Sequence, residues 1–130
     1  MAMIKFAKAI HEGKSIKVFN NGLHCRDFTY ISDAINAVVL TLDNATKPNY
    51  DWDSKNPSTA SSNAPWRIYN VGSNKPIKLL ELIHALEFNL NRKAVIELLP
   101  LQPGDVSETH ADIIELSNDL GYKPNITFPQ

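Results

Sequence analysis

Arg26 and Asp27 place a charge pair at the start of an otherwise apolar segment, Arg26–Ile31. The planar guanidinium group of an arginine presents several N–H donors that match two oxygens of a phosphate. The same pair also suits a salt bridge at a strand end, made by Arg26 with Asp27 or with a neighbouring acid. The residue types alone favour the salt bridge, and both roles stay open for Arg26.

A second group of polar residues is the turn sequence Gln102-Pro103-Gly104-Asp105. Proline and glycine favour a tight turn, which would direct the side chains of Gln102 and Asp105 toward one point. The Asp105 carboxylate could accept hydrogen bonds from sugar hydroxyls, or it could accept them from the turn's own N–H groups. Taken by itself, the turn favours the second role.

Other chemical motifs are missing from the sequence. Dinucleotide binding needs a glycine-rich turn between a strand and a helix, but the glycines are scattered, at positions 13, 22, 72, 104 and 121. No tyrosine is followed four residues later by a lysine, the pair used by short-chain nicotinamide enzymes. The histidines lack metal-ligand spacing, so surface or hydrogen-bonded histidine is expected. We therefore predict no catalytic residue, cofactor site or metal site in this chain.

The composition is that of an ordinary globular protein. The chain has 130 residues, enough for one domain, with 43% hydrophobic and 21% charged residues. Thirteen basic and fourteen acidic side chains give a net charge of -1. Because the net charge is close to zero, the chain as a whole has no positive electrostatic field that would attract nucleic acid or anionic lipid. We expect neither as a partner.

The cysteine content and the first residues of the sequence indicate the cellular compartment. Cys25 is the only cysteine, which excludes an internal disulfide and favours a reducing compartment. The first residues, MAMIKFAKAIHEGK, are too polar for a signal peptide, and no apolar run has the length of a membrane span. We expect a cytoplasmic protein that does not enter a membrane.

The elements that precede residue 44 alternate between helix and strand. Apolar spacing predicts a helix over Met3–His11 that Gly13 ends, and a strand over Ser15–Phe19. A turn at Asn20-Asn21-Gly22 separates this strand from a second one over Arg26–Ile31. Ser32 is expected to cap the next helix, whose apolar stripe consists of Ile35, Val38, Val39 and Leu42.

A polar segment, Asn44–Trp66, divides the chain, and its prolines and small polar residues predict a loop. The elements expected after it are a strand over Arg67–Val71, a helix over Leu79–Leu90, a strand over Val95–Leu99, and a helix that Asp112 caps and Gly121 ends. The first helix has no cap before it, and the chain stops soon after the last helix. We therefore expect a piece of a longer sequence.

Five segments resemble one family in their order along the chain: FAKAIHEGKSIKVFN, RDFTYISDAINAVV, APWRIYNVGSNKPIKLLELIHALE, LLPLQPGDVSETHAD and LGYKPN. Together they look like the carboxy-terminal part of the extended short-chain dehydrogenase/reductase family, and they are most similar to bacterial UDP-glucuronate 4-epimerases. The resemblance covers nearly the whole chain and is loosest over 44–66. It implies a small mixed α/β substrate-binding domain over residues 1–130, without the Rossmann domain.

The resemblance implies roles for particular residues. In the family, the amino-terminal Rossmann domain holds NAD and the Tyr–Lys pair, while the carboxy-terminal lobe binds UDP. Arg26 would contact the diphosphate, so the resemblance favours the phosphate role of Arg26 over the salt bridge. Asp105 would reach the uridine ribose or an arginine beside it, and the backbone of Lys17–Phe19, including Val18 and Phe19, would flank the uracil.

The chain departs from the family in two respects. Galactose-type epimerases carry an arginine where this chain has Gln102. The glutamine fits the glucuronate-type branch of the family, but it leaves the phosphate site with one positive charge fewer. The Rossmann domain and a final helix are absent from the sequence. We expect a fragment that is inactive alone, binds a UDP-sugar, self-associates, and pairs with a separate Rossmann-domain chain if the enzyme is split. A stand-alone UDP-sugar binding module and the remnant of a decayed gene are the alternatives.

Overall fold

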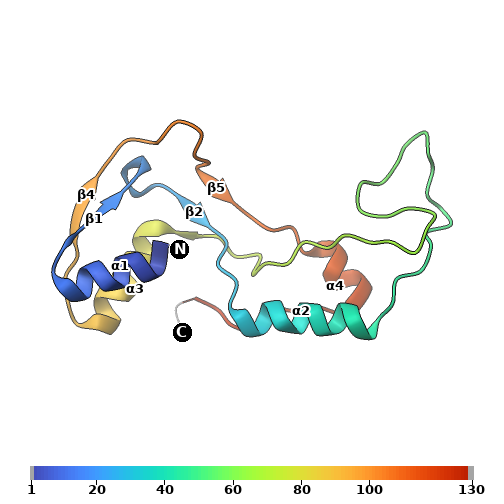
Figure 1. The fold of residues 1–130 in the computed structure, drawn as a ribbon, viewed down its shortest axis with the longest axis horizontal. Coiled ribbons are helices and arrows are strands. Elements are labelled where there is room, and N and C mark those ends of the chain that lie inside the picture. The colour runs from blue at the N-terminus through green and yellow to red at the C-terminus, as the bar shows by residue number, and fades with distance from the viewer. Residues whose placement is uncertain (1, 129–130) are drawn as a thin grey trace. The chain divides into compact units, whose positions relative to one another are not determined.

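The computed structural model describes residues 2–128, which group into two compact units (Figure 1). Unit 1 contains residues 2–28, 75–110 and 128, and unit 2 contains residues 29–74 and 111–127. Each unit is therefore assembled from segments that lie far apart in the sequence. The expectation of a single substrate-binding domain over residues 1–130 stays a prediction.

Unit 1 contains two small sheets. In the first, β1 (Ser15–Val18) pairs in parallel with β4 (Val95–Leu98). In the second, β2 (Cys25–Arg26) is central: it runs antiparallel to β3 (Ile77–Lys78) and parallel to β5 (Glu108–Thr109). The parallel pairs bring residues near 15–26 next to residues near 95–109.

Helices α1 (Ala2–Glu12) and α3 (Leu79–Leu90) contact each other in the same unit. The bounds of α3 agree with the sequence prediction, because its leucines and isoleucine recur at helical spacing and form one apolar face. That face supplies three of the five buried residues of the core. The buried residues of this core are Ile16, Val18, Leu79, Leu82 and Ile83.

A tight turn follows β1 and includes a short 3-10 helix, η1 (Asn20–Gly22). Asn20, Asn21 and Gly22 all have positive φ, at 51°, 50° and 80°, as expected from residues that tolerate this conformation. Gly22 is buried, and a Cβ atom there would lie 2.8 Å from side-chain carbons of Leu80. The turn therefore lets the backbone pass directly against α3.

Unit 2 contains α2 (Ile31–Asp43) and α4 (Ile114–Leu120), which Gly121 ends with a φ of 69°. Its core consists of Ala37, Ile113, Leu116 and Tyr122. The buried carboxylate of Asp33 accepts hydrogen bonds from the backbone N–H groups of Asn125 and Ile126, at 3.0–3.2 Å. This polar contact ties the start of α2 to the segment after α4.

Three predictions about unit 2 and the segment leading into it are wrong. The strand expected over Arg26–Ile31 ends at Arg26, and α2 begins at Ile31, so Ser32 lies inside the helix and Tyr30 is the N-cap residue. The segment 67–71 makes only an isolated bridge between Arg67 and Ser61. A strand needs a neighbouring strand for its backbone groups, and the described residues of unit 2 contain none.

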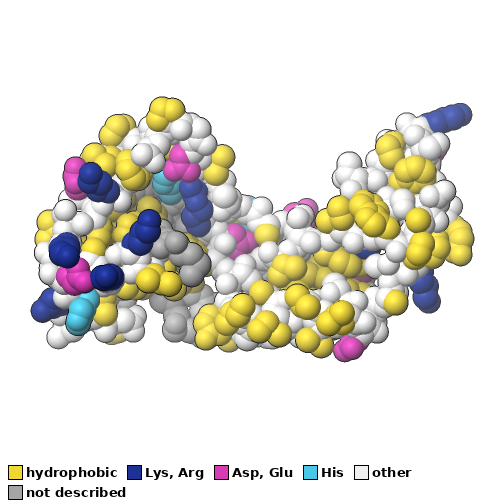
Figure 2. All heavy atoms as spheres, in the orientation of Figure 1, with side chains coloured by type: hydrophobic (Ala, Val, Ile, Leu, Met, Phe, Trp, Pro, Cys, Tyr) yellow, Lys and Arg dark blue, Asp and Glu magenta, His cyan; other side chains and the backbone are white. Residues whose placement is uncertain are grey.

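The apolar stripe of α2 is exposed rather than buried. Ile35, Val38, Val39 and Leu42 are each about half exposed or more, whereas Ala37 on another face of the helix is buried. Figure 2 shows hydrophobic side chains gathered over α2.

Residues 44–66 form no helix or strand beyond the bridge at Ser61, as the polar loop prediction expects. No helix within residues 2–128 is both long and apolar enough to cross a membrane.

The contact between Gly22 and Leu80 predicts a clear loss of stability in Gly22→Ala. Positive φ should cost about 1–2 kcal/mol, and displacing Leu80 about 1–3 kcal/mol more. Gly13→Ala is the matched control, because Gly13 also has positive φ, at 70°, but a Cβ atom there meets nothing within 4 Å. Urea denaturation measures both free energies of unfolding, and equal losses in the two variants would show that the contact with Leu80 has no effect.

Candidate functional site

The guanidinium group of Arg26 joins β2 to the segment that leads into β5. Its Nη1 atom donates to the carbonyl oxygens of Cys25 (2.9 Å) and Ser107 (3.1 Å). Its Nη2 atom donates to the Val106 carbonyl (2.8 Å) and to Asp105 Oδ1 (3.3 Å). Arg26 is half-buried, so these contacts hold residues 105–107 against β2 in a partly desolvated setting.

Asp105 ends the predicted turn and shares its two carboxylate oxygens among several groups. The turn is present, because the N–H of Asp105 donates to the Gln102 carbonyl (3.1 Å) and Gly104 has a φ of 83°. Oδ1 accepts from Arg26 and from the N–H of Val106 (2.9 Å). Oδ2 lies 3.3 Å from Nε2 of His24. Asp105 therefore accepts the backbone N–H that follows the turn and pairs with Arg26, while its predicted contact with a uridine ribose stays a prediction.

Val18, Phe19 and Gln102 lie in the same unit as this cluster. Val18 is fully buried, and its carbonyl accepts the N–H of Leu99 (2.9 Å), while the Phe19 carbonyl accepts the N–H of Gly22 (3.1 Å). Gln102 is exposed. The structure joins Arg26 and Asp105 directly, and hydrogen bonds at Leu99 connect the end of β1 to the strand that precedes the turn.

His24 is a member of this cluster that the sequence did not reveal. It was expected to be a surface or hydrogen-bonded histidine, but its side chain is buried and its Nε2 atom has no hydrogen bond to any described residue. Its distance to Asp105 is within the range of an ion pair, although the geometry is not that of a hydrogen bond. The only available signal was its position two residues before Arg26, which by itself indicates no function.

Unit 2 contains a separate charged cluster around Arg67. The guanidinium group contacts Asp119 at 2.8–3.0 Å and Glu115 at 3.6 Å, and the Tyr69 hydroxyl donates to Asp119 at 2.9 Å. Burial, and then the hydrogen bond to Asp119, raises the pKa of Tyr69. Because the carboxylates already neutralise Arg67, we interpret this cluster as structural.

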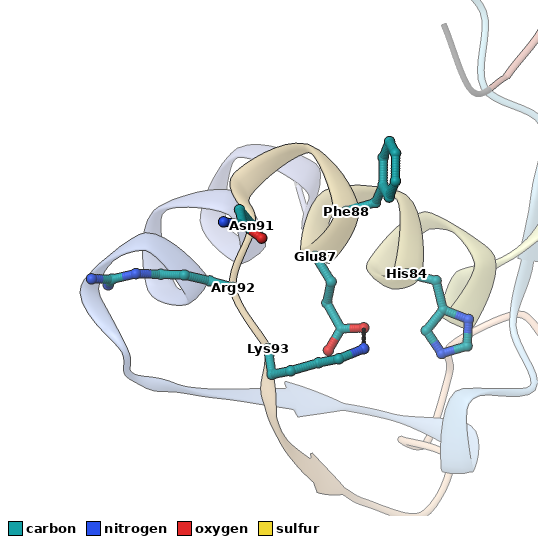
Figure 3. A pocket seen from close by; sticks show the side chains of 6 residues that line it. All are labelled: His84, Glu87, Phe88, Asn91, Arg92 and Lys93. Carbon is teal, nitrogen blue, oxygen red and sulfur yellow. Dashed lines mark hydrogen bonds and ion pairs between the residues drawn. The ribbon is translucent and has the colours of Figure 1, made fainter.

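A hollow of about 570 Å³ lies beside the end of α3 and shares no residue with the Arg26–Asp105 cluster (Figure 3). Figure 3 shows Glu87 turned toward Lys93, while Phe88 and Arg92 point in other directions. The hydrogen bond from the Ala94 N–H, followed by the one from Lys93, lowers the pKa of Glu87. Since its side chains do not converge on one point, the hollow does not have the arrangement of a ligand site.

Across residues 2–128, no three His, Cys, Asp or Glu side chains are grouped to hold a metal ion.

Comparison with known proteins agrees with the resemblance seen in the sequence. A family model described as GDP-mannose 4,6 dehydratase matches residues 1–130. Protein CapI of Staphylococcus aureus is 40% identical over 98% of this chain, and a probable UDP-glucuronate 4-epimerase of Rhizobium meliloti is 35% identical over 98%. The chain spans 38% of the length of each of these relatives.

Solved structures agree with these sequence matches. The UDP-glucuronic acid 4-epimerase of Bacillus cereus, in complex with UDP-glucuronic acid and NAD, superposes with a TM-score of 0.77 at 28% identity. The match covers 98% of this chain and 35% of that protein. The mixed α/β fold is thus that of the epimerase and dehydratase enzymes, over about a third of their length.

The Arg26 contacts predict that Arg26→Lys loosens the segment around residue 106. A lysine ammonium cannot span the same four oxygens, and losing such charge-assisted bonds should speed local opening about ten-fold or more. Hydrogen exchange should then accelerate at the amides of Cys25 and Val106, but not at Leu99, which bonds to β1. Arg92→Lys is the control, because Arg92 contacts the His11 carbonyl instead. Unchanged exchange at Val106 would contradict the role of Arg26 as a clamp.

Proposed function

Because the chain belongs to the GDP-mannose 4,6-dehydratase family, we propose that it is the UDP-binding part of a nucleotide-sugar 4-epimerase that acts on a UDP-hexuronate or UDP-hexose. The observation that carries the proposal is the Arg26–Asp105 pair, which sets a cation beside a hydroxyl acceptor. A nucleoside diphosphate offers both complementary groups within one molecule, its phosphates and its ribose hydroxyls. The names of relatives that include UDP-glucuronate 4-epimerases support the choice of UDP.

Binding of a diphosphate would rearrange the contacts of Arg26. Its longest bond is the one from Nη2 to Asp105 Oδ1, at 3.3 Å, and this is the bond that a phosphate oxygen would replace most easily. The exchange would free Oδ1 of Asp105 to accept a ribose hydroxyl. Arg26 would then contact the phosphates as expected, while its bonds to Val106 and Ser107 keep the turn in place.

The proposal assigns no catalytic residue and no NAD contact to this chain. Hydride transfer and acid–base chemistry would belong to a Rossmann domain, supplied by the same polypeptide or by a separate chain. The chain alone is then inactive. A second candidate function is a non-catalytic UDP-sugar binding module, and it is favoured by one observation: Arg26, Asp105 and Val18 all lie within unit 1.

Gln102 provides a test of the phosphate site that leaves the fold intact, because its side chain is exposed. Gln102→Arg should tighten UDP binding about ten-fold through one charge-assisted contact, and Gln102→Glu should weaken it. Arg26→Ala should abolish binding. Calorimetric titration with UDP measures all three variants.

Asn118→Arg is the matched control, since it adds the same charge on α4 in unit 2 and should leave the affinity unchanged. Native protein that shows no binding at millimolar UDP would overturn the proposed half-site in the isolated chain. Equal tightening by both arginine substitutions would indicate general charge attraction instead of a local site.

The exposed stripe of α2 predicts self-association of the isolated chain, because an uncovered apolar helix face favours burial against a second copy. Leu42→Glu should shift the protein toward monomer in sedimentation, since Leu42 is 76% exposed on that stripe. Leu23→Glu is the control: Leu23 is 68% exposed but belongs to unit 1 and is not part of the stripe. A native protein that sediments as a monomer at all concentrations would contradict the prediction.

A further inference from the structure

His24 occupies an unusual position for a polar side chain. It is only 4% exposed, and its Nε2 atom has no hydrogen bond to a described residue. A buried polar atom in this state has lost its water without gaining a partner, which is unfavourable unless a partner forms in another state of the protein. The nearest carboxylate oxygen that the structure gives is Oδ2 of Asp105, at 3.3 Å.

From this geometry we infer that His24 is a positioning residue for Asp105, and that UDP-sugar binding is coupled to protonation of its imidazole. The inference rests on the function proposed above and goes beyond it by adding a residue and a pH dependence. His24 does not itself contact the ligand. It acts through the carboxylate that does.

The charges around the imidazole favour this coupling. On β2 the charged neighbour is Arg26, which holds the opposite oxygen of Asp105. The adjoining strands contribute Lys78 on β3 and Glu108 on β5, both exposed and both paired in register with Cys25 rather than with His24. Among these groups, Asp105 alone has an atom within ion-pair distance of the imidazole.

The two protonation states of His24 act differently on Asp105. A doubly protonated imidazole donates from Nε2 to Oδ2, and it holds the carboxylate even after a phosphate oxygen has replaced the bond from Arg26 to Oδ1. A neutral imidazole carries one proton: on Nε2 it donates without a positive charge, and on Nδ1 it leaves a lone pair facing Oδ2, so the carboxylate is held less firmly. A fixed carboxylate accepts ribose hydroxyls better, and a cationic imidazole adds positive charge beside the diphosphate. The protonated state therefore binds the ligand more tightly.

The sign of the pH dependence follows from linkage. If the complex holds more protons than the free protein, affinity rises as pH falls. One coupled proton changes the affinity by at most about 100-fold over two pH units, and we expect a change of at least about three-fold between pH 8 and pH 6. UDP-glucose is the suitable probe, because its diphosphate is esterified at both ends, whereas UDP has a terminal phosphate that itself titrates near pH 6.

The test is calorimetric titration of the whole chain with UDP-glucose at pH 6, 7 and 8, in buffers of different ionisation enthalpy. Native protein should bind more tightly at pH 6 and take up a fraction of a proton at pH 7. His24→Gln should still bind, because an amide N–H can donate to Asp105, but its affinity should not vary with pH. His84→Gln is the control: His84 is exposed on α3, and its substitution should leave the native profile unchanged.

The outcomes separate this inference from the proposed function. Binding by native protein with no proton uptake and no pH dependence overturns the role of His24 and leaves the UDP site intact, and this result needs no variant to fold. A pH dependence that persists in His24→Gln also overturns it. Absence of UDP-glucose binding at every pH overturns the proposed site and the inference together.

Discussion

The candidate site depends on the hydrogen bonds that the guanidinium group of Arg26 donates. β2 and β5 are only two residues long, and a ladder this short has few backbone bonds to hold a long connection in place. Arg26 adds donors to three carbonyl groups and one carboxylate, so the turn ending at Asp105 stays beside β2. The same contacts explain why the turn and the strand, 79 residues apart in sequence, form one site.

The stabilising role of Arg26 and the ligand-binding role proposed for it use the same hydrogen-bond donors. Both terminal nitrogens of Arg26 contact protein oxygens, so the residue behaves as a clamp. Diphosphate binding would replace the weakest of these bonds and keep the others. A pair that is satisfied without ligand avoids leaving a half-buried charge unpaired, and it lets Asp105 change partners at small cost.

Unit 2 combines a small core with an exposed apolar surface. Its small core forms around Tyr122 and Leu116, and the buried carboxylate of Asp33 finds backbone donors within the unit. Residues 67–71 nevertheless form no strand, and the apolar stripe of α2 is exposed. An extended segment without a neighbouring strand and an exposed apolar helix face are both surfaces on which another element can pack.

The sequence by itself determined the elements that rest on local chemistry. The apolar period of α3, the positive-φ turn ending at Gly22, and the helix stops at Gly13 and Gly121 depend on neighbouring residues alone, and the structure agrees with each. It also identified the family, because five segments occur in one order. Tertiary structure decided the rest. Strand formation at 67–71 depends on a partner, the start of α2 depends on packing, and the approach of His24 to Asp105 joins residues 81 positions apart. Such contacts produce no periodic pattern in the sequence, because they depend on residues far apart in the chain and not on local propensity.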